Sequence, residues 1–437
     1  MLNVLIDAYA VSPSWGSEPG MGWNWVSNLA RYCNLCVITE GEWQKEIETA
    51  MDAAMRGDMD KSVNPTGLMR EQAERMHFYY LNVSAEVRTM CWNQGSWKFY
   101  LYYEQWERRA YALAQQLIGD FKGTDHNIDL VHKLNMIGFR EPGYLWKITD
   151  LPFVWGPVGG YGNVPQAFML DASLALRLKS VLKTVINYVS IRWQPRVRKA
   201  ARRADAMAGA YKETYEMLHK LYGDKVVLIN ETGTLADEHA VAHSSDREEL
   251  QLLWVGKYDL RKQLGIALQT MARLKQRPNI HLYVLGTGYD ADVKRYTDMV
   301  KQLGLSATVH LMGTIPNVQT REWMHRADLL FFTSIHDATS TVVPEAISAG
   351  LPVVCHNTRG FGDLVDDSIG RKVEVVSPEH SAAEFARIIE ALDADRALVR
   401  TLSEGCLRRR HDISWEANAR RMVLQYEKAI AAFRTRK

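Results

Sequence analysis

Two carboxylates with seven residues between them, Asp337 and Glu345, lie in the segment with the clearest capacity for chemistry. The run 328–333 before them is almost wholly apolar and predicts a buried strand. Pro344, directly before Glu345, is typical of the first turn of a helix. The segment therefore predicts a strand, a polar loop and a helix start that together face a ligand.

The start of this helix offers two kinds of ligand group, and the loop before it offers a third. The backbone amides of Ser340, Thr341 and Val342 would bind an anion such as a phosphate. Glu345 would accept hydrogen bonds from hydroxyls such as those of a ribose. Asp337 would face whatever extends beyond the phosphates.

A second group of candidates precedes this segment in the sequence. Gly256 and Lys257 end the apolar run 250–255, and Lys262 begins the next helical pattern. A lone lysine is ordinarily a solvated surface residue. Because these two follow one strand, both could reach the same anion, and we expect them to bind phosphate.

Gly20 and Gly22 follow the first predicted strand, and we expect them in a glycine loop. They could serve only as a turn, or they could let backbone amides approach a sugar or phosphate closely because they lack a side chain. We expect the second role.

The elements that position these residues alternate between apolar strands and amphipathic helices, which predicts α/β architecture with doubly wound parallel sheets. The expected strands are 3–8, 35–39, 77–81, 128–132, 153–155, 206–210, 226–229, 250–255, 280–285, 309–312, 329–332 and 352–355. The expected domains are 1–235 and 250–413, with a linker at 236–249 and a helix at 414–437. Such sheets bind ligands at the carboxyl ends of their strands.

Together these motifs resemble those of retaining glycosyltransferases of family 4, in one bacterial branch. The resemblance rests on the order and spacing of five segments and covers nearly the whole chain. They are GSEPGMGW at 16–23, WGPVGG at 155–160, LWVGKYDLRK at 253–262, TVHLMGT at 308–314 and the carboxylate segment at 334–354.

The resemblance implies a GT-B fold, in which two Rossmann-like domains face each other across a cleft and the carboxyl-terminal helix returns to the first, acceptor-side domain. It also implies a nucleotide diphosphate sugar as donor, a hydroxyl of a glycan or glycolipid as acceptor, and no cofactor. The setting that it implies is the biosynthesis of a surface polysaccharide. The implied catalytic residues are Lys257, Lys262, Asp337 and His132. The implied substrate-binding residues are Gly20, Gly22, Gly256, Thr314, Ser340, Thr341, Val342 and Glu345. A structural role for His132 stays open.

Five positions depart from the family's pattern. Asp337 replaces a Glu, Lys257 an Arg, and Gln263 a Gly, while 339–340 are Thr-Ser where Phe-Gly is commonest. Asp337 reaches less far by one methylene, so the loop closes in or the donor sugar sits differently. The substitution also keeps open a non-catalytic nucleotide-binding partner with the same fold. A sugar-nucleotide epimerase would need catalytic acids and a histidine that the sequence does not reveal.

Composition narrows the class of protein. The chain has 437 residues, 47% of them hydrophobic, which is enough for two cores, and its formal net charge of +2 argues against a nucleic-acid-binding protein. No apolar run approaches the roughly 20 residues of a membrane span. The first residues predict a strand rather than a signal peptide, so we expect a cytoplasmic protein.

Metal and thiol chemistry are not expected. The pair Asp290 and Asp292 opens a predicted helix, where acidic residues complement the helix dipole, so we expect no metal there. Cys33 and Cys36 have the spacing of a redox or zinc pair, but no second pair accompanies them, and we expect a structural role.

Two further stretches have two readings each. The stretch 174–203 interleaves basic and apolar residues, as in a solvated helix with an ordinary core stripe or in a helix at the inner face of an anionic membrane. Its basic residues are Arg177, Lys179, Lys183, Arg192, Arg196, Arg198, Lys199, Arg202 and Arg203. The aromatic residues of 92–106 predict helix packing, with sugar stacking as the alternative.

Overall fold

The computed structural model describes residues 1–84, 86–87, 89, 97–169, 174–243, 247–337 and 340–436. It divides into two compact units. Unit 1 comprises Met1–Tyr161, Ile186–Glu231 and Trp415–Lys437, and unit 2 comprises Gly162–Val185 and Thr232–Ser414. The segment Gly162–Val185, which we expected within the first domain, is thus part of unit 2. Phe168 explains this, because it is buried in the core of unit 2 against His356.

Unit 1 is built on a seven-stranded parallel sheet with the order β3-β2-β1-β4-β5-β6-β7. Its strands are β1 (Leu2–Asp7), β2 (Cys33–Glu40), β3 (Met76–Leu81), β4 (Leu130–Lys133), β5 (Phe153–Val158), β6 (Ala206–Gly209) and β7 (Val226–Leu228). The central strand β1 pairs with β2 and β4, and Val4, Leu5 and Ile6 are fully buried. This continuous apolar run is typical of a parallel strand covered by helices on both faces.

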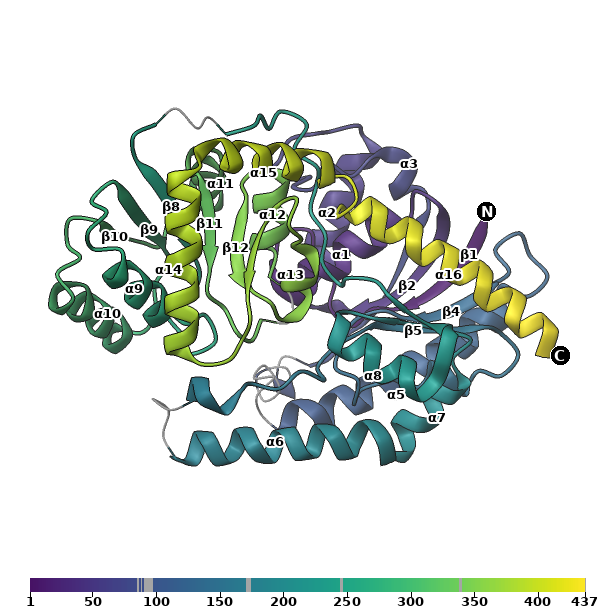
Figure 1. The fold of residues 1–437 in the computed structure, drawn as a ribbon. Coiled ribbons are helices and arrows are strands. Elements are labelled where there is room, and N and C mark those ends of the chain that lie inside the picture. Colours follow the sequence, from purple (N-terminus) through teal and green to yellow (C-terminus); the bar gives the residue numbers. More distant parts are fainter. Residues whose placement is uncertain are drawn as a thin grey trace. The chain divides into compact units, whose positions relative to one another are not determined.

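The helices of unit 1 include the last one in the chain. They are α1 (Ser17–Leu29), α2 (Gln44–Met55), α3 (Arg70–Ala73), α5 (Trp97–Asp120), α7 (Pro195–Arg203), α8 (Lys212–Tyr222) and α16 (Trp415–Arg436). Helix α16, the long yellow helix of Figure 1, packs on α1, β5 and β6, with Trp415 edge-on to Trp25. A further helix, α6 (Leu174–Trp193), contributes residues to both units.

Unit 2 is built on a six-stranded parallel sheet with the order β10-β9-β8-β11-β12-β13. Its strands are β8 (Leu250–Val255), β9 (Ile280–Leu285), β10 (Val309–Gly313), β11 (Leu329–Phe332), β12 (Val353–His356) and β13 (Gly370–Val373). All twelve strands expected from the sequence are present. Only β13 was missed, because this short edge strand has the sequence GRKV and lacks an apolar run.

The helices of unit 2 complete two doubly wound sheets. They are α9 (Leu264–Arg273), α10 (Asp290–Gln302), α11 (Asn317–Arg326), α12 (Val342–Ser348), α13 (Arg359–Leu364), α14 (Pro378–Ala394) and α15 (Arg396–Arg409). Helix α14 packs against α9, and α12 packs against α15 (Figure 1). The expected fold class, α/β with two Rossmann-like units, is confirmed.

The aromatic residues of α5 form packing contacts. Tyr9 lies edge-on to the rings of Phe99, Tyr103 and Trp106, with the centroids of Tyr9 and Trp106 5.0 Å apart. These three side chains of α5 are buried, which confirms the expectation of helix packing for them. Trp92, which belonged to the same expectation, lies outside the described residues.

Cys33 and Cys36 are both buried in β2. Residues three apart in a strand point to opposite faces, so the two thiols do not form one site. Burial raises the pKa of Cys33 to about 12 and that of Cys36 to about 11, which keeps both as neutral thiols.

Candidate functional site

The order in which the chain adds strands to the sheet of unit 2 reverses between β8 and β11. From β8 the chain moves outward through β9 and β10, and it then returns to the other side of β8 for β11, β12 and β13. The loops that leave the carboxyl ends of β8 and β11 therefore run apart. Open parallel sheets bind their ligands at this switch point.

The loop after β8 is held by a local turn. Oδ1 of Asp259 accepts hydrogen bonds from the backbone N–H groups of Arg261, at 2.9 Å, and Lys262, at 3.1 Å. Gln263, which caps α9, has a φ of 54°. This left-handed region favours glycine, which gives a physical reason for the Gly that the family pattern carries at this position.

The same loop is tied to the end of β11. The Thr333 hydroxyl points to the carbonyl oxygens of Lys262, at 2.8 Å, and Gln263, at 3.1 Å. It also accepts a hydrogen bond of 2.9 Å from Nε1 of Trp254, and the N–H of Ile335 donates to the carbonyl of Arg261. These contacts fix Lys262 relative to the loop after β11.

Lys262 and Asp337 form an ion pair at the switch point. Their side chains are 12% and 17% exposed, so the pair is largely enclosed yet still reaches solvent. Nζ of Lys262 also lies 4.8 Å from the ring centroid of Phe332. The structure thus brings together two of the expected catalytic residues, 75 positions apart in the chain.

Gly256 and Lys257 lie at the carboxyl end of β8. A Cβ at Gly256 would lie 3.3 Å from Cγ and Cδ of Lys262, so the missing side chain leaves room for the stem of that lysine. The side chain of Lys257 is exposed and makes no ion pair with any residue that the structure describes. Gly256 accordingly shapes the site through Lys262, while Lys257 is accessible to a ligand.

The start of α12 holds the remaining predicted residues of this segment. The Ser340 side chain is buried, and its Oγ has no hydrogen-bond partner among the described residues. Thr341 is exposed, and Val342 begins the helix. Burial raises the pKa of the Glu345 carboxyl, although the charge of Arg321 and a hydrogen bond with the Thr341 side chain oppose this rise.

Thr314 lies at the carboxyl end of a different strand in the same sheet. It follows Gly313, the last residue of β10, and is exposed. The N–H of Gly286 donates to the carbonyl of Gly313, and that of Gly256 donates to the carbonyl of Leu285. A Cβ at Gly286 would lie 1.8 Å from the carbonyl oxygen of Gly256, so only glycine fits where β8 and β9 end.

Two further residues of this region were not predicted as site residues. Nη2 of Arg359 donates to Nδ1 of His336, at 3.1 Å, and to the carbonyl oxygen of Asn163, at 2.7 Å. Burial and the Arg359 charge lower the pKa of His336 to about 4, so this histidine is neutral and accepts the hydrogen bond. Its place directly before Asp337 was a usable signal, whereas nothing in the sequence distinguishes Arg359.

His356, at the end of β12, holds the loop after β11 in place through hydrogen bonds. Its Nδ1 lies 3.1 Å from the carbonyl oxygen of Thr333 and 3.2 Å from that of Ser334, and its Nε2 lies 2.9 Å from Oγ of Ser381. Because carbonyl oxygens only accept, Nδ1 carries the proton. Burial lowers the pKa of His356 to about 4, which keeps it neutral.

Unit 1 has the same kind of switch point, between β1 and β4. Gly20 and Gly22 lie within α1 rather than in a loop, and the predicted glycine loop is in this respect wrong. A Cβ at Gly20 would lie 2.2 Å from the carbonyl oxygen of Trp15, and one at Gly22 would lie 2.1 Å from that of Ala10. Both glycines therefore let α1 pack against the chain that precedes it.

Glu18 connects the two loops at this switch point. Its Oε1 accepts hydrogen bonds from the backbone N–H of Met136, at 2.6 Å, and of Ile137, at 3.2 Å. Nδ2 of Asn135 donates to the carbonyl of Ala10 in the same region. These polar groups therefore have hydrogen-bond partners within the protein.

His132 is fully buried in β4, and both of its ring nitrogens are engaged. Nε2 donates to the carbonyl oxygen of Gly156, at 2.6 Å, so Nδ1 accepts from the Tyr426 hydroxyl, at 2.7 Å. Burial lowers its pKa to about 4. These contacts favour the structural reading of His132 over a place in the site.

Beside His132, a buried cluster of charged groups joins β1 to β4. Nζ of Lys133 lies 3.0 Å from Oδ1 of Asp7, 2.5 Å from Oε1 of Glu107 and 2.8 Å from the Tyr103 hydroxyl. Burial and the charge of Glu107 hold the pKa of Asp7 well above its usual range. Burial disfavours the charged form of Lys133, but its two carboxylate partners outweigh that effect and raise its pKa.

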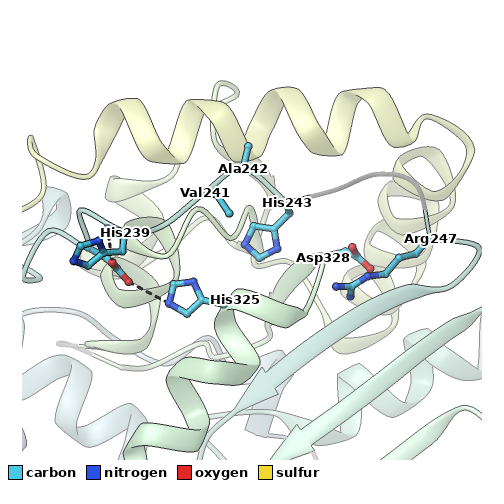
Figure 2. A pocket seen from close by; sticks show the side chains of 8 residues that line it. His239, Val241, Ala242, His243, Arg247, His325 and Asp328 are labelled. Atoms are coloured by element: carbon cyan, nitrogen blue, oxygen red, sulfur yellow. Dashed lines mark hydrogen bonds and ion pairs between the residues drawn. The ribbon is translucent and has the colours of Figure 1, made fainter.

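A pocket of about 490 Å³ lies elsewhere in unit 2 (Figure 2). It is lined by His243, Arg247, His325 and Asp328, among others, and an ion pair of 3.1 Å joins His325 to Asp237 at its edge. Asp328 precedes β11, so the pocket lies at the amino ends of the strands. Because parallel sheets bind ligands at the opposite ends and no expected site residue lines this pocket, we assign it no role in the site.

The acidic pair at the start of α10 was a candidate for metal binding. Asp290 and Asp292 lie in the first turn of α10, as expected for residues that complement a helix dipole. Within the described parts of the chain, no cluster of three or more His, Cys, Asp or Glu side chains is arranged to hold a metal ion.

Part of the chain is similar in sequence to known proteins. Residues 236–405 match the family described as glycosyl transferases group 1. An uncharacterized glycosyltransferase of Methanocaldococcus jannaschii is 23% identical over 42% of this chain and 46% of its own length. D-inositol 3-phosphate glycosyltransferase 1 of Catenulispora acidiphila is 23% identical over 55% of this chain and 58% of its own length. The chain thus spans about half the length of these relatives.

Similarity of structure extends over both units. The Anabaena protein HepE, solved in complex with UDP, superposes with a TM-score of 0.58 at 12% identity and covers 97% of this chain and 98% of its own. The same protein has also been solved with UDP-glucose. At this identity the likeness shows the fold alone. The chain therefore has the GT-B fold, and its residues 236–405 match the group 1 glycosyl transferases.

Proposed function

We propose that this protein is a retaining glycosyltransferase that moves a sugar from a nucleotide diphosphate sugar to a hydroxyl of a glycan or glycolipid. The observation that carries the proposal is the Lys262–Asp337 ion pair at the switch point of unit 2. A cation and a carboxylate meet there, and α12 begins five residues after the carboxylate in the chain. Asp337 lies eight positions before Glu345 in the chain. The family match at 236–405 includes all of these residues.

Lys262 acts on the donor diphosphate by exchanging partners. Without ligand, Asp337 neutralises its ammonium group. A diphosphate that enters the switch point takes the place of Asp337, whose carboxylate then turns to the hydroxyls of the donor sugar. Lys257, exposed on the same loop, supplies a second cation. Thr314 and Gly256, at the ends of β10 and β8, line the nucleotide side.

Glu345 binds the ribose of the nucleotide. Burial raises the pKa of its carboxyl, and hydrogen bonds from two ribose hydroxyls would compensate for the lost hydration of the charged form. Ser340 supports the same arrangement, because its buried hydroxyl lacks a partner among the described residues and a ligand oxygen would complete it. Thr341 and Val342 contribute their backbone amides to the phosphates.

Charge on the departing diphosphate rises in the transition state, so the two lysines stabilise that state more than the bound donor. Attack by the acceptor from the same face as the departing group retains the configuration. In that geometry the departing phosphate accepts the proton of the acceptor hydroxyl, and the protein need not supply a pair of catalytic carboxylates. No cofactor takes part.

The setting of the reaction is also part of the proposal. The acceptor is a growing surface polysaccharide or glycolipid, and the protein works in the cytoplasm at the inner face of the membrane. The Anabaena protein solved with UDP-glucose supports a nucleotide diphosphate sugar as donor. The base, the sugar and the linkage are left to experiment.

A thermal-shift screen of nucleotide sugars tests this function first. A donor present at about 100 times its dissociation constant stabilises the protein by roughly 2.7 kcal/mol. Turnover with the donor found in this way, followed by NMR of the anomeric proton in the product, then tests retention. An inverted product, or no stabilisation by any nucleotide sugar, would contradict the proposal.

The proposed reaction needs no divalent metal, because Lys257 and Lys262 neutralise the diphosphate. Activity should survive chelation with EDTA. Loss of turnover that magnesium or manganese restores would instead require carboxylate ligands for a metal bound with the donor.

A non-catalytic nucleotide-binding partner is the competing proposal. It would share the fold, and Asp337, where the family pattern has a Glu, keeps this alternative open. The presence of Lys257, Lys262 and Glu345 counts against it. Such a protein would be stabilised by nucleotide sugars in the same screen and yet transfer nothing to any acceptor. Slow hydrolysis of the donor, which needs no acceptor, separates the two proposals.

A further inference from the structure

Helix α6 faces the protein with its polar side. A stripe of buried or partly buried residues, spaced three and four apart as on one face of a helix, runs along it and consists of Arg177, Ser180, Thr184, Asn187 and Ile191. Ser190 and Arg192, beside the end of this stripe, are also partly buried. Only Ile191 in this stripe is apolar. A surface helix of a globular protein normally has the opposite arrangement, with an apolar stripe toward the core.

Hydrogen bonds hold the polar side in place. Nε2 of Gln166 donates to Oγ of Ser180 at 3.2 Å. Farther along the helix, the guanidinium of Arg140 donates to Oδ1 of Asn187, and Nδ2 of Asn187 lies 3.5 Å from the carbonyl oxygen of Tyr161. The orientation of α6 is therefore supported by contacts at two places along its length.

The apolar side of α6 points outward. It includes Leu174, Leu178, Val181, Leu182, Val185 and Val189. Each of these side chains is between 44% and 69% exposed. The interpretation of such residues as an ordinary core stripe is therefore wrong for α6. A contiguous apolar face of this kind on a folded protein marks a docking surface.

Charge identifies what docks there. The stretch 174–203 contains nine Arg and Lys and no Asp or Glu, while the whole chain has a net charge of +2, so the other residues sum to −7. Lys179 and Lys183 are exposed along one border of the apolar face. Pairing with a second copy through this face would oppose like charges, whereas an anionic surface complements them.

We propose that α6 is a membrane-docking helix that lies in the plane of an anionic lipid bilayer, with its apolar face among the acyl chains and its lysines at the headgroups. Among the described residues no helix is long and apolar enough to cross a membrane. An amphipathic helix with basic residues beside its apolar face binds in this in-plane manner. The inference concerns the outward face of α6, and it holds whether or not the protein transfers sugars.

Flotation with vesicles tests the docking helix. The full-length protein is mixed with vesicles of pure phosphatidylcholine, or with vesicles that also contain about a third phosphatidylglycerol. We expect it to float with the anionic vesicles only, and to be released as salt is raised, since screening weakens the attraction.

Three variants separate the two contributions. Lys179→Gln with Lys183→Gln should weaken partitioning into anionic vesicles by about 25-fold, at about fivefold for each basic residue. Leu178→Ser with Leu182→Ser should weaken it by about tenfold or more, because two leucines no longer leave water. The control is Leu424→Ser, which changes an exposed leucine on α16 and should partition like the unaltered protein.

Two outcomes would overturn the proposal. One is that the unaltered protein stays unbound with anionic vesicles at low salt. The other is that the leucine variant floats as well as the control. Light scattering of the free protein distinguishes the main competitor: a dimer that the leucine variant converts to a monomer, without vesicle binding, would show that the face receives a second copy.

Discussion

An ammonium–carboxylate pair lies at the switch point of each unit, and the side chains of the two pairs differ in their exposed fraction. In unit 1, Lys133 joins Asp7, and both side chains are 1% exposed. In unit 2, Lys262 joins Asp337 at 12% and 17%. Lys133 has two carboxylates and a tyrosine hydroxyl around it, whereas Lys262 has a single carboxylate. The same topology thus places a fully enclosed ion pair in one unit and an ion pair that reaches solvent in the other.

From this difference we infer that a charged pair at a switch point can act as a binding site only when a ligand can replace one partner. Breaking a buried pair leaves a charge without solvation, while a pair that reaches solvent can change partners at small cost. The following predictions test this contrast, from the largest expected effect to the smallest.

Removing the buried ammonium should have the largest effect. Lys133→Met leaves Asp7 and Glu107 as neighbouring buried carboxylates, and we expect a loss of about 3–5 kcal/mol in the free energy of unfolding. The matched variant Lys262→Met should lose no more than about 1 kcal/mol. Urea unfolding followed by circular dichroism measures both. Equal losses would remove the distinction between the two pairs.

Acid should destabilise unit 2 more than unit 1. The pKa values of His356 and His336 in unit 2, and of His132 in unit 1, are all lowered to about 4. A lowered pKa means stability that is present above the unfolded value of about 6.5 and lost as pH falls toward 4, about 3 kcal/mol for a fully buried histidine. The raised pKa of Asp7 acts in the opposite direction within unit 1.

Hydrogen exchange at pH 6.5, 5.5 and 4.5, resolved by peptide, measures this difference. We expect protection to fall first in peptides from β11 and β12. Earlier loss in β1 and β4 would reverse the comparison.

Removing the cations that a donor can reach, Lys262 and Lys257, should impair donor use rather than folding. A hydrogen bond to a charged group contributes roughly 1.5–3 kcal/mol. Lys262→Ala and Lys257→Ala should therefore each lower kcat/KM for the donor by about one to two orders of magnitude. Lys301→Ala, on the exposed surface of α10, is the control. Unchanged turnover in Lys262→Ala would refute the assignment.

The two carboxylates of the site should separate binding from turnover. Glu345→Ala should weaken both the bare nucleotide and the whole donor. Asp337→Ala should leave affinity for the nucleotide intact or raise it, since Lys262 loses its competing partner, and should lower kcat by about tenfold or more. Calorimetry beside turnover assays measures both quantities. Equal loss of nucleotide affinity in the two variants would contradict this division, and Asp337→Glu should retain more activity than Asp337→Ala.

The smallest effect concerns the backbone next to Lys262. Gln263 has a φ of 54°, and a residue with a Cβ pays about 1 kcal/mol for this conformation. Gln263→Gly should therefore raise the free energy of unfolding by up to about 1 kcal/mol, without changing kcat. Thermal unfolding measures the gain. A clear loss of stability would mean that the hydrogen bond from the Gln263 side chain to the carbonyl of Leu260 outweighs the strain.

Several features of the site could be predicted because they follow from local sequence. Lys262 and Asp337 were both expected near a ligand, from their places after two apolar strands. Glu345 was expected in the first turn of a helix, and it lies there in α12. Gly20 and Gly22 were placed in a loop because glycines after a strand usually form a turn, but their packing against Trp15 and Ala10 lets a helix begin earlier.

The sequence alone determined the two parallel-sheet units, since strand and helix periodicities are set by neighbours a few residues apart. Only the tertiary structure decided which residues meet across the chain. It paired Lys262 with Asp337, enclosed His132 between Gly156 and Tyr426, and turned the polar side of α6 toward the protein. Such contacts join residues far apart in sequence, and packing selects them from many chemically equivalent partners.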